Sequence, residues 1–270
     1  MKSIVPWFCL VLAASAPAAH AENVLEAYRS GQYTKAANHF LNGSKPDKVG
    51  YDYLGQMYLY GYGVLKNNQR AIQSLSKSAD QGFLPAQKLM ARYELIHEKN
   101  PSNALKWFKK AAEKGDLKAQ LYCAAAYHFG VGVSKNKDKA RRYDIMAAKQ
   151  GNSLAQASLA EHFLESRHAS NKRLGMIWVK RAVKQKEPEA EYLLAEVYLE
   201  GKLAHKDLGE AKRLYDSALA ADYVPAMKGL ARLAKVQDNE ELSTTWTKKF
   251  EIADSKISKV PEVLASHWLS

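Results

Sequence analysis

The chain has 270 residues, a formal net charge of +12 at pH 7 and only two cysteines. Beyond residue 21 it contains no apolar stretch long enough to cross a membrane, which takes about 20 residues. The positive charge suits an acidic partner, such as a phosphorylated lipid head group or an anionic envelope polymer, although it can equally serve solubility alone.

The first 21 residues have the pattern of a secretory signal peptide. Lys2 gives a basic start, residues 4–14 are mostly apolar, and residues 19–21 (Ala-His-Ala) have the small-x-small form that signal peptidase cuts. Cleavage would start the mature chain at Glu22 and place it in a bacterial periplasm or outside the cell. The alternative is a retained anchor, for which the apolar run is short and no stop-transfer pattern follows. In such a compartment we expect no nucleic-acid partner.

Residues 22–49 are expected to form an N-terminal cap. Residues 27–37 (AYRSGQYTKAA) are similar to a degenerate tetratricopeptide hairpin. An atypical unit is expected at the end of a repeat array, because one of its faces has no neighbour to cover it.

From residue 50 onward one unit recurs with a period of 33 to 36 residues. Periods of this length indicate helical hairpins stacked into a solenoid, in which no unit buries its apolar face alone. The fifth position of each unit is large and the sixth is small, which lets the next helix approach closely. The six units begin at Gly50, Ala86, Ala119, Ala155, Ala190 and Ala226, and their fifth positions are Leu54, Met90, Cys123, Leu159, Leu194 and Leu230.

Cys123 therefore occupies a leucine position, and we expect a buried structural thiol there rather than a reactive one. It is the only cysteine of the expected mature chain, so an internal disulfide is excluded.

Glycines and prolines mark the ends of the predicted helices. Glycine pairs within residues 60–64 and 129–133 are expected to end the first helix of a unit and redirect the chain. The second helix is expected to end at Gly82, Gly115 or Gly151, and Pro85, Pro188 and Pro225 stand at the entry of the next unit, where a missing N–H costs little.

The pattern Ala-x-x-x-Leu-Gly-x-x-Tyr-x-x-Gly-x-Gly-Val, followed by Ala, an aromatic residue, Ala-Ala and Gly, resembles the Sel-one-like repeat, a relative of the tetratricopeptide repeat. The resemblance implies an all-α fold, a right-handed αα-superhelix (solenoid) of about five to six hairpins between degenerate caps. The repeats would span 50–85, 86–118, 119–154, 155–189 and 190–225, with 226–270 as a degenerate repeat and C-terminal cap. In that cap Trp246 and Phe250 share one helix side, and residues 260–270 either fold back or dock on a partner.

No catalytic, metal-binding or cofactor-binding motif is found. Glu161 with Glu165, and Glu196 with Glu200, are carboxylates four residues apart. Such pairs can serve glycoside cleavage only across a cleft, so a solvated acidic face is the simpler interpretation. Cysteine-rich members of the resembled family have been linked to penicillin binding, but this chain lacks their paired cysteines.

The resemblance also implies that the first helices line a concave groove. We predict that a partner protein or peptide binds there, where basic units flank an acidic middle and could read an extended segment of complementary charge. Exposed helix faces are polar in any case, which is the alternative interpretation. The predicted partner-binding residues are Asp52, Gln56, Tyr60, Lys88, Arg92, His128, Phe129, Glu161, Tyr192, Glu196, Lys228 and Arg232. A second, basic surface is expected on residues 99–149 of the outer helices, where an acidic envelope component could dock.

These features favour a non-catalytic scaffold or adaptor of the periplasm or cell envelope. Two alternatives remain open, namely a secreted virulence or host-entry factor and a peptidoglycan-acting enzyme or its regulator. The partner and the oligomeric state are not indicated.

Overall fold

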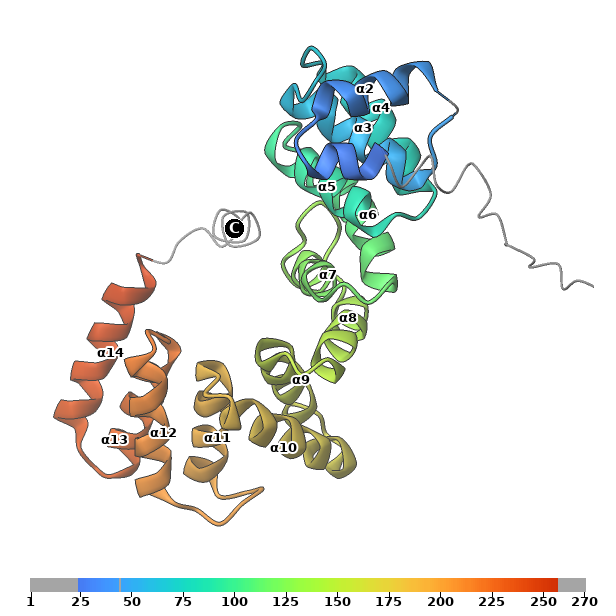
Figure 1. The fold of residues 1–270 in the computed structure, drawn as a ribbon. Helices are drawn as coiled ribbons and strands as arrows, with labels where there is room; N and C mark the ends of the chain where they lie inside the picture. Colours follow the sequence, from blue (N-terminus) through green and yellow to red (C-terminus); the bar gives the residue numbers. More distant parts are fainter. Residues whose placement is uncertain (1–23, 44, 257–270) are drawn as a thin grey trace, which may run out of the picture. The chain divides into compact units, whose positions relative to one another are not determined.

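The computed structural model describes residues 24–43 and 45–256, and these residues are helical with no strand among them. The all-α class predicted from the repeat is therefore confirmed. The predicted signal peptide, the mature start at Glu22 and the predicted tail at 260–270 lie outside the described residues. Residues 24–29 are helical, and the following helices are α2 (Tyr33–Asn42), α3 (Lys48–Tyr60), α4 (Asn68–Asp80), α5 (Leu84–Ile96), α6 (Pro101–Glu113), α7 (Leu117–Phe129), α8 (Lys137–Lys149), α9 (Ser153–Leu164), α10 (Ala169–Lys184), α11 (Pro188–Glu200), α12 (Leu208–Ala220), α13 (Pro225–Val236) and α14 (Glu240–Asp254) (Figure 1).

The chain forms two compact units that divide within α5, one ending at Met90 and the other beginning at Ala91. In unit 1, α3 and α4 form a hairpin, and α2 packs against α3. The N-terminal part of this unit has a small core in which Ala36 and Ala37 of α2 meet Met57 of α3. The stretch predicted as a cap is thus joined to the first repeat through buried side chains.

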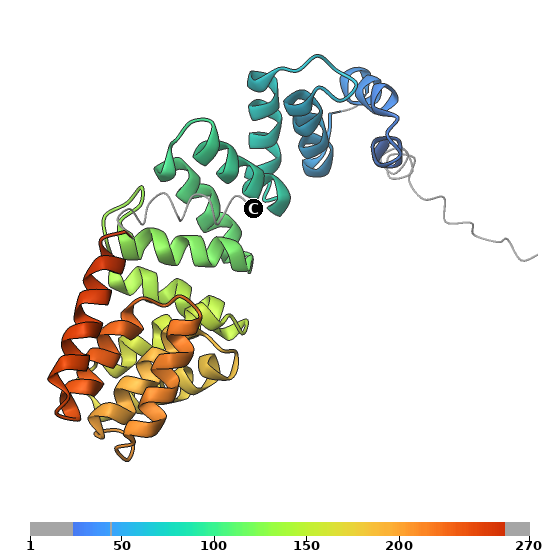
Figure 2. The same ribbon diagram turned by 90° about the vertical axis from the view of Figure 1, so that its left-hand side faces the viewer.

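Unit 2 is a succession of helical hairpins: α7 with α8, α9 with α10, α11 with α12, and α13 with α14. Each hairpin packs against the next, and the two views of the fold show α14 lying beside α13 at the end of the series (Figures 1 and 2). Contacts also join α9 to α11 and α11 to α13, so the first helices of successive hairpins are neighbours. This arrangement gives unit 2 one surface made of first helices.

Most helix starts are fixed by an Asp or Asn placed one residue before the helix. The side-chain oxygens of Asp116, Asn136 and Asn152 each accept a hydrogen bond from a backbone N–H three residues later, at 2.8–2.9 Å. Such a cap satisfies one of the N–H groups that the first helical turn leaves without a partner.

The glycine turns form as predicted. Gly61, Gly130 and Gly201 end the first helices of three hairpins in the left-handed conformation. Gly132 is required for a second reason, because a Cβ there would lie 2.5 Å from the backbone carbonyl carbon of Pro101. The ends of α10 and α12 differ from the other repeats, since Lys186 and Asp222 adopt positive φ where a glycine would be unstrained.

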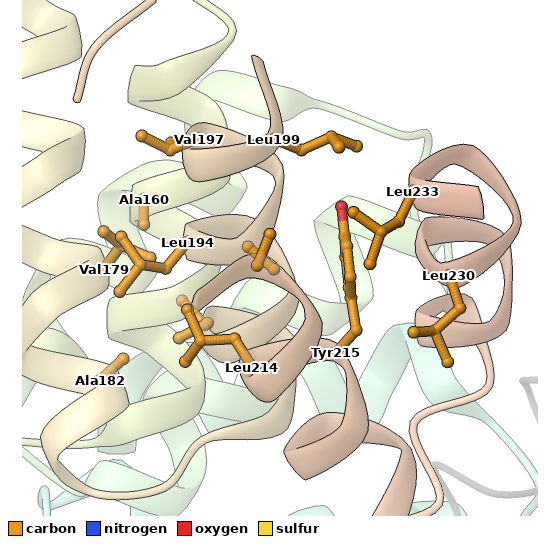
Figure 3. Packing of buried hydrophobic residues seen from close by; sticks show 14 residues of the cluster. Ala160, Val179, Ala182, Leu194, Val197, Leu199, Leu214, Tyr215, Leu230 and Leu233 are labelled. Carbon is orange, nitrogen blue, oxygen red and sulfur yellow. The ribbon is translucent and has the colours of Figure 1, made fainter. Parts of the chain in front are cut away.

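The large and small residues predicted at positions five and six are all buried. Around α11, Leu194 and Ala195 pack with Val179 of α10, Leu214 of α12 and Leu230 of α13 in one cluster (Figure 3). Cys123 is fully buried, and burial raises the pKa of its thiol to about 12. The predicted burial of this thiol is confirmed.

A chain of buried glutamines ties consecutive hairpins together. Gln120 donates from Nε2 to the carbonyl of Ala112 (3.1 Å), and its Oε1 accepts from Nε2 of Gln150 (2.7 Å). Gln156 repeats this arrangement one hairpin later, with Ala148 and Gln185 as its partners. Each amide therefore satisfies the end of the preceding helix and also bonds to the end of the following one.

Candidate functional site: the groove of unit 2

Unit 2 contains a groove along its first helices, formed by two pockets. The first pocket has a volume of about 190 Å³ and lies among α7, α8, α9 and α11. The second pocket, about 390 Å³, lies among α9, α10, α11 and the turn after α11. Glu161 lines both and joins them. The first pocket is lined by Leu121, Ala124, Ala125, His128, Phe129, Asp144, Leu154, Ser158, Glu161 and Glu189, and the second by Glu161, Leu164, Glu165, Lys172, Tyr192, Leu193, Glu196, Val197, Glu200, Lys202 and Leu203.

Three carboxylates face the first pocket from three different helices. Asp144 of α8 is 8% exposed, and one of its oxygens accepts a hydrogen bond from Ser158 Oγ at 2.9 Å. Glu161 comes from α9 and Glu189 from the first turn of α11. Among the described residues, no lysine or arginine forms an ion pair with any of the three.

Partial or full burial raises the pKa of all three carboxyl groups. It raises the pKa of Asp144 to about 6, and only the Ser158 hydrogen bond acts the other way. Burial, followed by repulsion from Glu161, Glu187 and Asp144, raises the pKa of Glu189 to about 7. The pKa of Glu161 is raised by burial and by Glu165, and it is lowered less strongly by His128 and Lys137. His128 and Lys137 offset part of the charge of Glu161, and Arg141, which lines a neighbouring pocket with Asp144 and Glu161, is paired with Asp138. The first pocket thus gathers acidic groups, of which Asp144 and Glu189 have no lysine or arginine paired with them among the described residues.

The other walls of the first pocket are apolar. Phe129 at the end of α7 is 44% exposed and Leu154 at the start of α9 is 48% exposed. Leu121, Ala124 and Ala125 complete this wall on α7. An apolar wall beside a carboxylate cluster suits a ligand group with an apolar body and a polar end.

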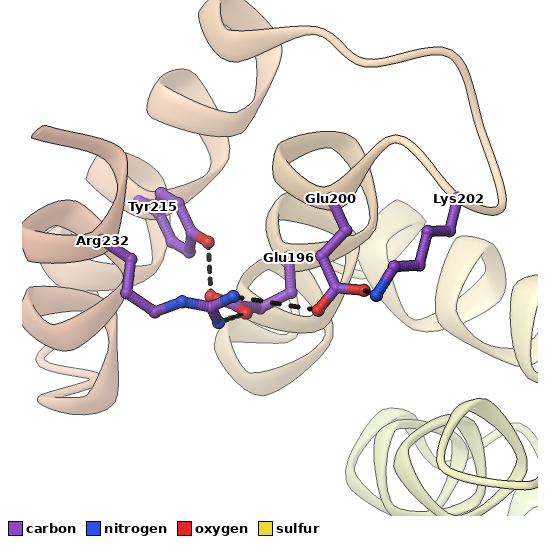
Figure 4. Close-up of polar contacts among 5 residues, drawn as sticks. All are labelled: Glu196, Glu200, Lys202, Tyr215 and Arg232. Carbon is purple, nitrogen blue, oxygen red and sulfur yellow. Dashed lines mark hydrogen bonds and ion pairs between the residues drawn. The ribbon is translucent and has the colours of Figure 1, made fainter. Parts of the chain in front are cut away.

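At the far end of the second pocket, α11 is linked to α12 and α13 by polar contacts. Tyr215 of α12 donates its hydroxyl to Glu196 Oε1 at 2.5 Å, and Arg232 of α13 pairs with Glu196 Oε2 (Figure 4). Glu200 forms two ion pairs: its Oε1 lies 3.8 Å from Nη2 of Arg232, and its Oε2 lies 3.3 Å from Nζ of Lys202. The carboxylate pair of Glu196 and Glu200 is therefore held in a network, in which Glu200 stays exposed and Glu196 is largely covered. The predicted solvated acidic face fits Glu161, Glu165 and Glu200, and it is wrong for Glu196.

The predicted site residues fall into both units. In unit 1, Tyr60 is 53% exposed and Gln56 is partly exposed, whereas Asp52 is only 3% exposed and accepts a hydrogen bond from Gln56 Nε2 at 2.7 Å. The helix position of Asp52 predicts an exposed residue on the open face, and this prediction is wrong because Asp52 is buried. The N-terminal helix covers this part of α3, where Tyr28 donates to Gln56 and packs its ring on Tyr53.

In unit 2 the structure brings His128, Phe129 and Glu161 together at the first pocket, and Tyr192 and Glu196 at the second. The remaining predicted residues lie elsewhere on the surface or within contacts already described. Lys88 is partly exposed in unit 1, Arg92 and Lys228 are exposed on α5 and α13, and Arg232 pairs with Glu196.

Sequence analysis missed two residues of the first pocket, Asp144 and Glu189. Asp144 is on the second helix of its hairpin, within a strongly basic stretch. An isolated acidic residue among basic ones is the only signal of it in the sequence, which does not show that the side chain is buried. Glu189 follows Pro188 in the first turn of α11. An acidic residue is favoured there by the helix dipole, so its presence does not by itself indicate a binding site.

The described residues include no group of three or more His, Cys, Asp or Glu side chains arranged to hold a metal ion. No helix within residues 24–43 and 45–256 combines the length and the apolar character needed to cross a bilayer.

The sequence profile of the Sel1 repeat matches residues 50–83, 85–116, 117–152 and 188–223, which together make up about half of the chain. The chain belongs to the Sel1 repeat family. The predicted unit at 155–189 lies between the third and fourth matches, and α9 and α10 form a hairpin there.

Two solved structures share the fold of this Sel1 repeat chain. A Sel1 repeat protein from Oxalobacter formigenes is 24% identical with a TM-score of 0.52, over 86% of this chain and 96% of that one. A protective antigen present in uropathogenic Escherichia coli strains is 24% identical with a TM-score of 0.56, over 93% and 61%.

Curated relatives match only over part of the Sel1 repeat chain. Chitin synthase regulatory factor 3 of Schizosaccharomyces pombe is 34% identical over 125 residues, which are 44% of this chain and 13% of that protein. An uncharacterised protein of Neisseria meningitidis is 33% identical over 95 residues, 35% of this chain and 20% of that protein. The chain thus covers a fifth or less of the length of these relatives.

Proposed function

We propose that this Sel1 repeat chain is a non-catalytic scaffold that binds a partner protein or peptide in the groove of unit 2. Sel1 repeat proteins are generally protein-interaction scaffolds. The observation that carries the proposal is the first pocket, because it combines exposed apolar side chains with carboxylates that lack a counter-ion. Binding of a complementary partner to such a surface is favourable, because it buries the apolar side chains and pairs the carboxylates.

The network around Glu196 argues against a hydrolytic role for the paired carboxylates. A general acid needs a free carboxyl group within reach of the substrate oxygen. Glu196 instead binds Tyr215 and Arg232, and Glu200 binds Arg232 and Lys202. These five residues are better explained as an anchor that sets the position of α13 beside α11.

Site-specific photocrosslinking in the source cells tests the scaffold proposal. Benzoylphenylalanine would replace Phe129 or Leu154 in the groove and, as a matched control, Ile177, which is exposed on α10. We expect the two groove positions to capture the same protein and the α10 position not to capture it. Equal capture from all three positions, or none from the groove, would contradict the proposal.

We propose that the scaffold works in the periplasm or cell envelope. The support is the signal-peptide pattern of residues 1–21. N-terminal sequencing of the protein from a periplasmic fraction should give Glu22 as the first residue. A chain that keeps Met1 and stays with the cytoplasmic fraction would refute this location.

The outer helices support a further contact with an acidic envelope component. Lys106 of α6 and Lys139 and Arg142 of α8 are exposed. Reversing these three charges should weaken binding to anionic envelope polymer without changing the groove crosslinks. Unchanged polymer binding would refute this contact.

A further inference from the structure

The geometry of the first pocket assigns the partner's chemistry: we propose that the groove binds a basic extended segment and that one lysine or arginine side chain of that segment enters the first pocket. This inference rests on the proposed function and names the kind of partner that the groove accepts. It concerns unit 2 alone, since every lining residue lies in that unit.

The first pocket contains a buried carboxyl group that has no ion-pair partner among the described residues. Asp144 is more than nine-tenths buried and lines the pocket, and the side chain that bonds to it, Ser158, is neutral. Buried ionised groups are normally paired, because an isolated charge in a poorly solvated site is costly. Two cations of α8 lie nearby, but Arg141 is paired with Asp138 and Lys137 forms no ion pair with Asp144, Glu161 or Glu189. The first pocket therefore leaves a place for a cation of the ligand between Asp144, Glu161 and Glu189.

The shape of the first pocket matches a long basic side chain. A lysine or arginine side chain has an apolar stem and a charged end. The pocket offers the same sequence of surfaces, with Phe129 and Leu154 on the exposed rim and Asp144 at its buried end. Its volume of about 190 Å³ is below the range of about 300–1,000 Å³ typical of small-molecule sites. A single side chain therefore fits it better than a complete small ligand does.

The groove continues from the first pocket into the second. The second pocket shares Glu161 and adds Glu165 and Tyr192 on its α9 and α11 sides. Its basic residues are Lys172 of α10 and Lys202, and Lys202 is paired with Glu200. An extended segment can place further basic or polar residues there. The overall charge of +12 repels cationic peptides elsewhere on the surface, which makes binding by a basic peptide diagnostic of the groove.

A binding assay with three matched peptides tests the inference. A fluorescein-labelled peptide of Ala-Ser-Lys repeats is titrated with the full chain, and peptides carrying norleucine or glutamate in place of lysine are compared with it. We expect the lysine peptide to bind and the other two to bind at least about tenfold more weakly, because only an ammonium group satisfies the carboxylates. Equal binding of the norleucine peptide would overturn the inference.

Protein variants locate the binding. Asp144→Asn with Glu161→Gln and Glu189→Gln should weaken binding of the lysine peptide at least about tenfold, while Glu251→Gln on the exposed face of α14 should leave it unchanged. Glu189→Lys places a cation of the protein itself in the pocket and should also abolish binding. An equal effect of Glu251→Gln would show nonspecific attraction and overturn the inference.

The two proposals can fail separately. If the groove positions still crosslink a partner but the lysine peptide does not bind, the scaffold function stands and the basic-segment inference is wrong. If crosslinks from the groove are absent as well, the proposed function itself is refuted.

Discussion

Asp144 shows how a single buried carboxyl group lowers stability at the place where a ligand would bind. Its pKa is raised from the ordinary 3.8 to about 6 because burial disfavours the charged form. Above pH 6 both the folded and the unfolded states are ionised, so the folded state carries the whole cost of the buried charge. Below pH 4 both are protonated and the cost disappears. The contribution of this group to stability therefore falls as the pH rises from 4 to 6.

Asp144→Asn should consequently stabilise the chain at neutral pH. We expect a gain of about 1–3 kcal/mol at pH 7.5 and almost none at pH 4, measured by urea unfolding followed by circular dichroism. The amide can still accept the hydrogen bond from Ser158. Titration of Glu189 occurs in both proteins and largely cancels in the comparison.

The control for this prediction is Asp254→Asn, a change of the same kind at an exposed residue near the end of α14. It should alter stability little at either pH. A loss of stability in Asp144→Asn at pH 7.5 would mean that the native carboxylate is stabilised by a partner, which is the opposite of the expectation.

Lys186 is strained by its backbone conformation. Its φ of 58° lies in the left-handed region, where Gly115 and Gly151 occupy the matching positions after α6 and α8. Relief of this strain exceeds the added freedom of glycine in the unfolded chain, so Lys186→Gly should stabilise by about 0.5–1 kcal/mol. Lys180→Gly, within α10, should instead destabilise by about 1 kcal/mol. Thermal unfolding of both variants checks the opposite signs, and a loss in Lys186→Gly refutes the argument.

Periodicity predicts those residues whose environment is set within one repeat. Leu159 and Ala160 are buried because positions five and six of every unit face the neighbouring helix. Periodicity does not predict the burial of Asp144 or Asp52, because their surroundings come from other segments: α9, which supplies Ser158, in one case and the N-terminal helix in the other. The sequence therefore predicts part of the first pocket, namely His128, Phe129 and Glu161, but not its buried acidic end.

At the scale of the element, the glutamine chain explains how one hairpin fixes the position of the next. Gln120 lies in the first turn of α7 and is bonded to both the preceding and the following helix end. A side-chain hydrogen bond contributes about 0.5–1.5 kcal/mol to stability. Because Gln120→Leu removes the donor to Ala112 and also the acceptor for Gln150, we expect a loss of about 1–3 kcal/mol in the unfolding free energy.

Lys118→Leu on the same helix is the matched change, since Lys118 is exposed. It should shift stability by less than about 0.5 kcal/mol. Similar unfolding curves for the two variants would show that packing of α7, and not the amide bonds, holds the hairpins together.

The helices themselves were well predicted, for reasons that can be stated at single positions. Gly130 ends α7 and Pro188 begins α11. Glycine adopts the left-handed conformation without strain and proline fixes its own φ, and both properties hold irrespective of the surrounding fold. The unit at 155–189 lacks the glycine turn, yet α9 and α10 pair through the buried side chains of Ala160 and Val179. Tertiary packing there replaces the missing local signal.

At the scale of the molecule, the division within α5 predicts that damage to one unit stays in that unit. Repeat arrays are stabilised by contacts between neighbours, so distant hairpins unfold independently. Gly63 tests this in unit 1, because a Cβ there would collide with the backbone carbonyl of Tyr33. We expect Gly63→Ala to speed amide hydrogen exchange in α2 and α3 at least about tenfold and to leave α11 and α12 unchanged. Gly31→Ala is the control, since Gly31 also has positive φ but meets nothing within 4 Å, and it should have a much smaller effect on α3. Equal acceleration of exchange in α3 and α11 would show instead that the two units unfold as one cooperative body.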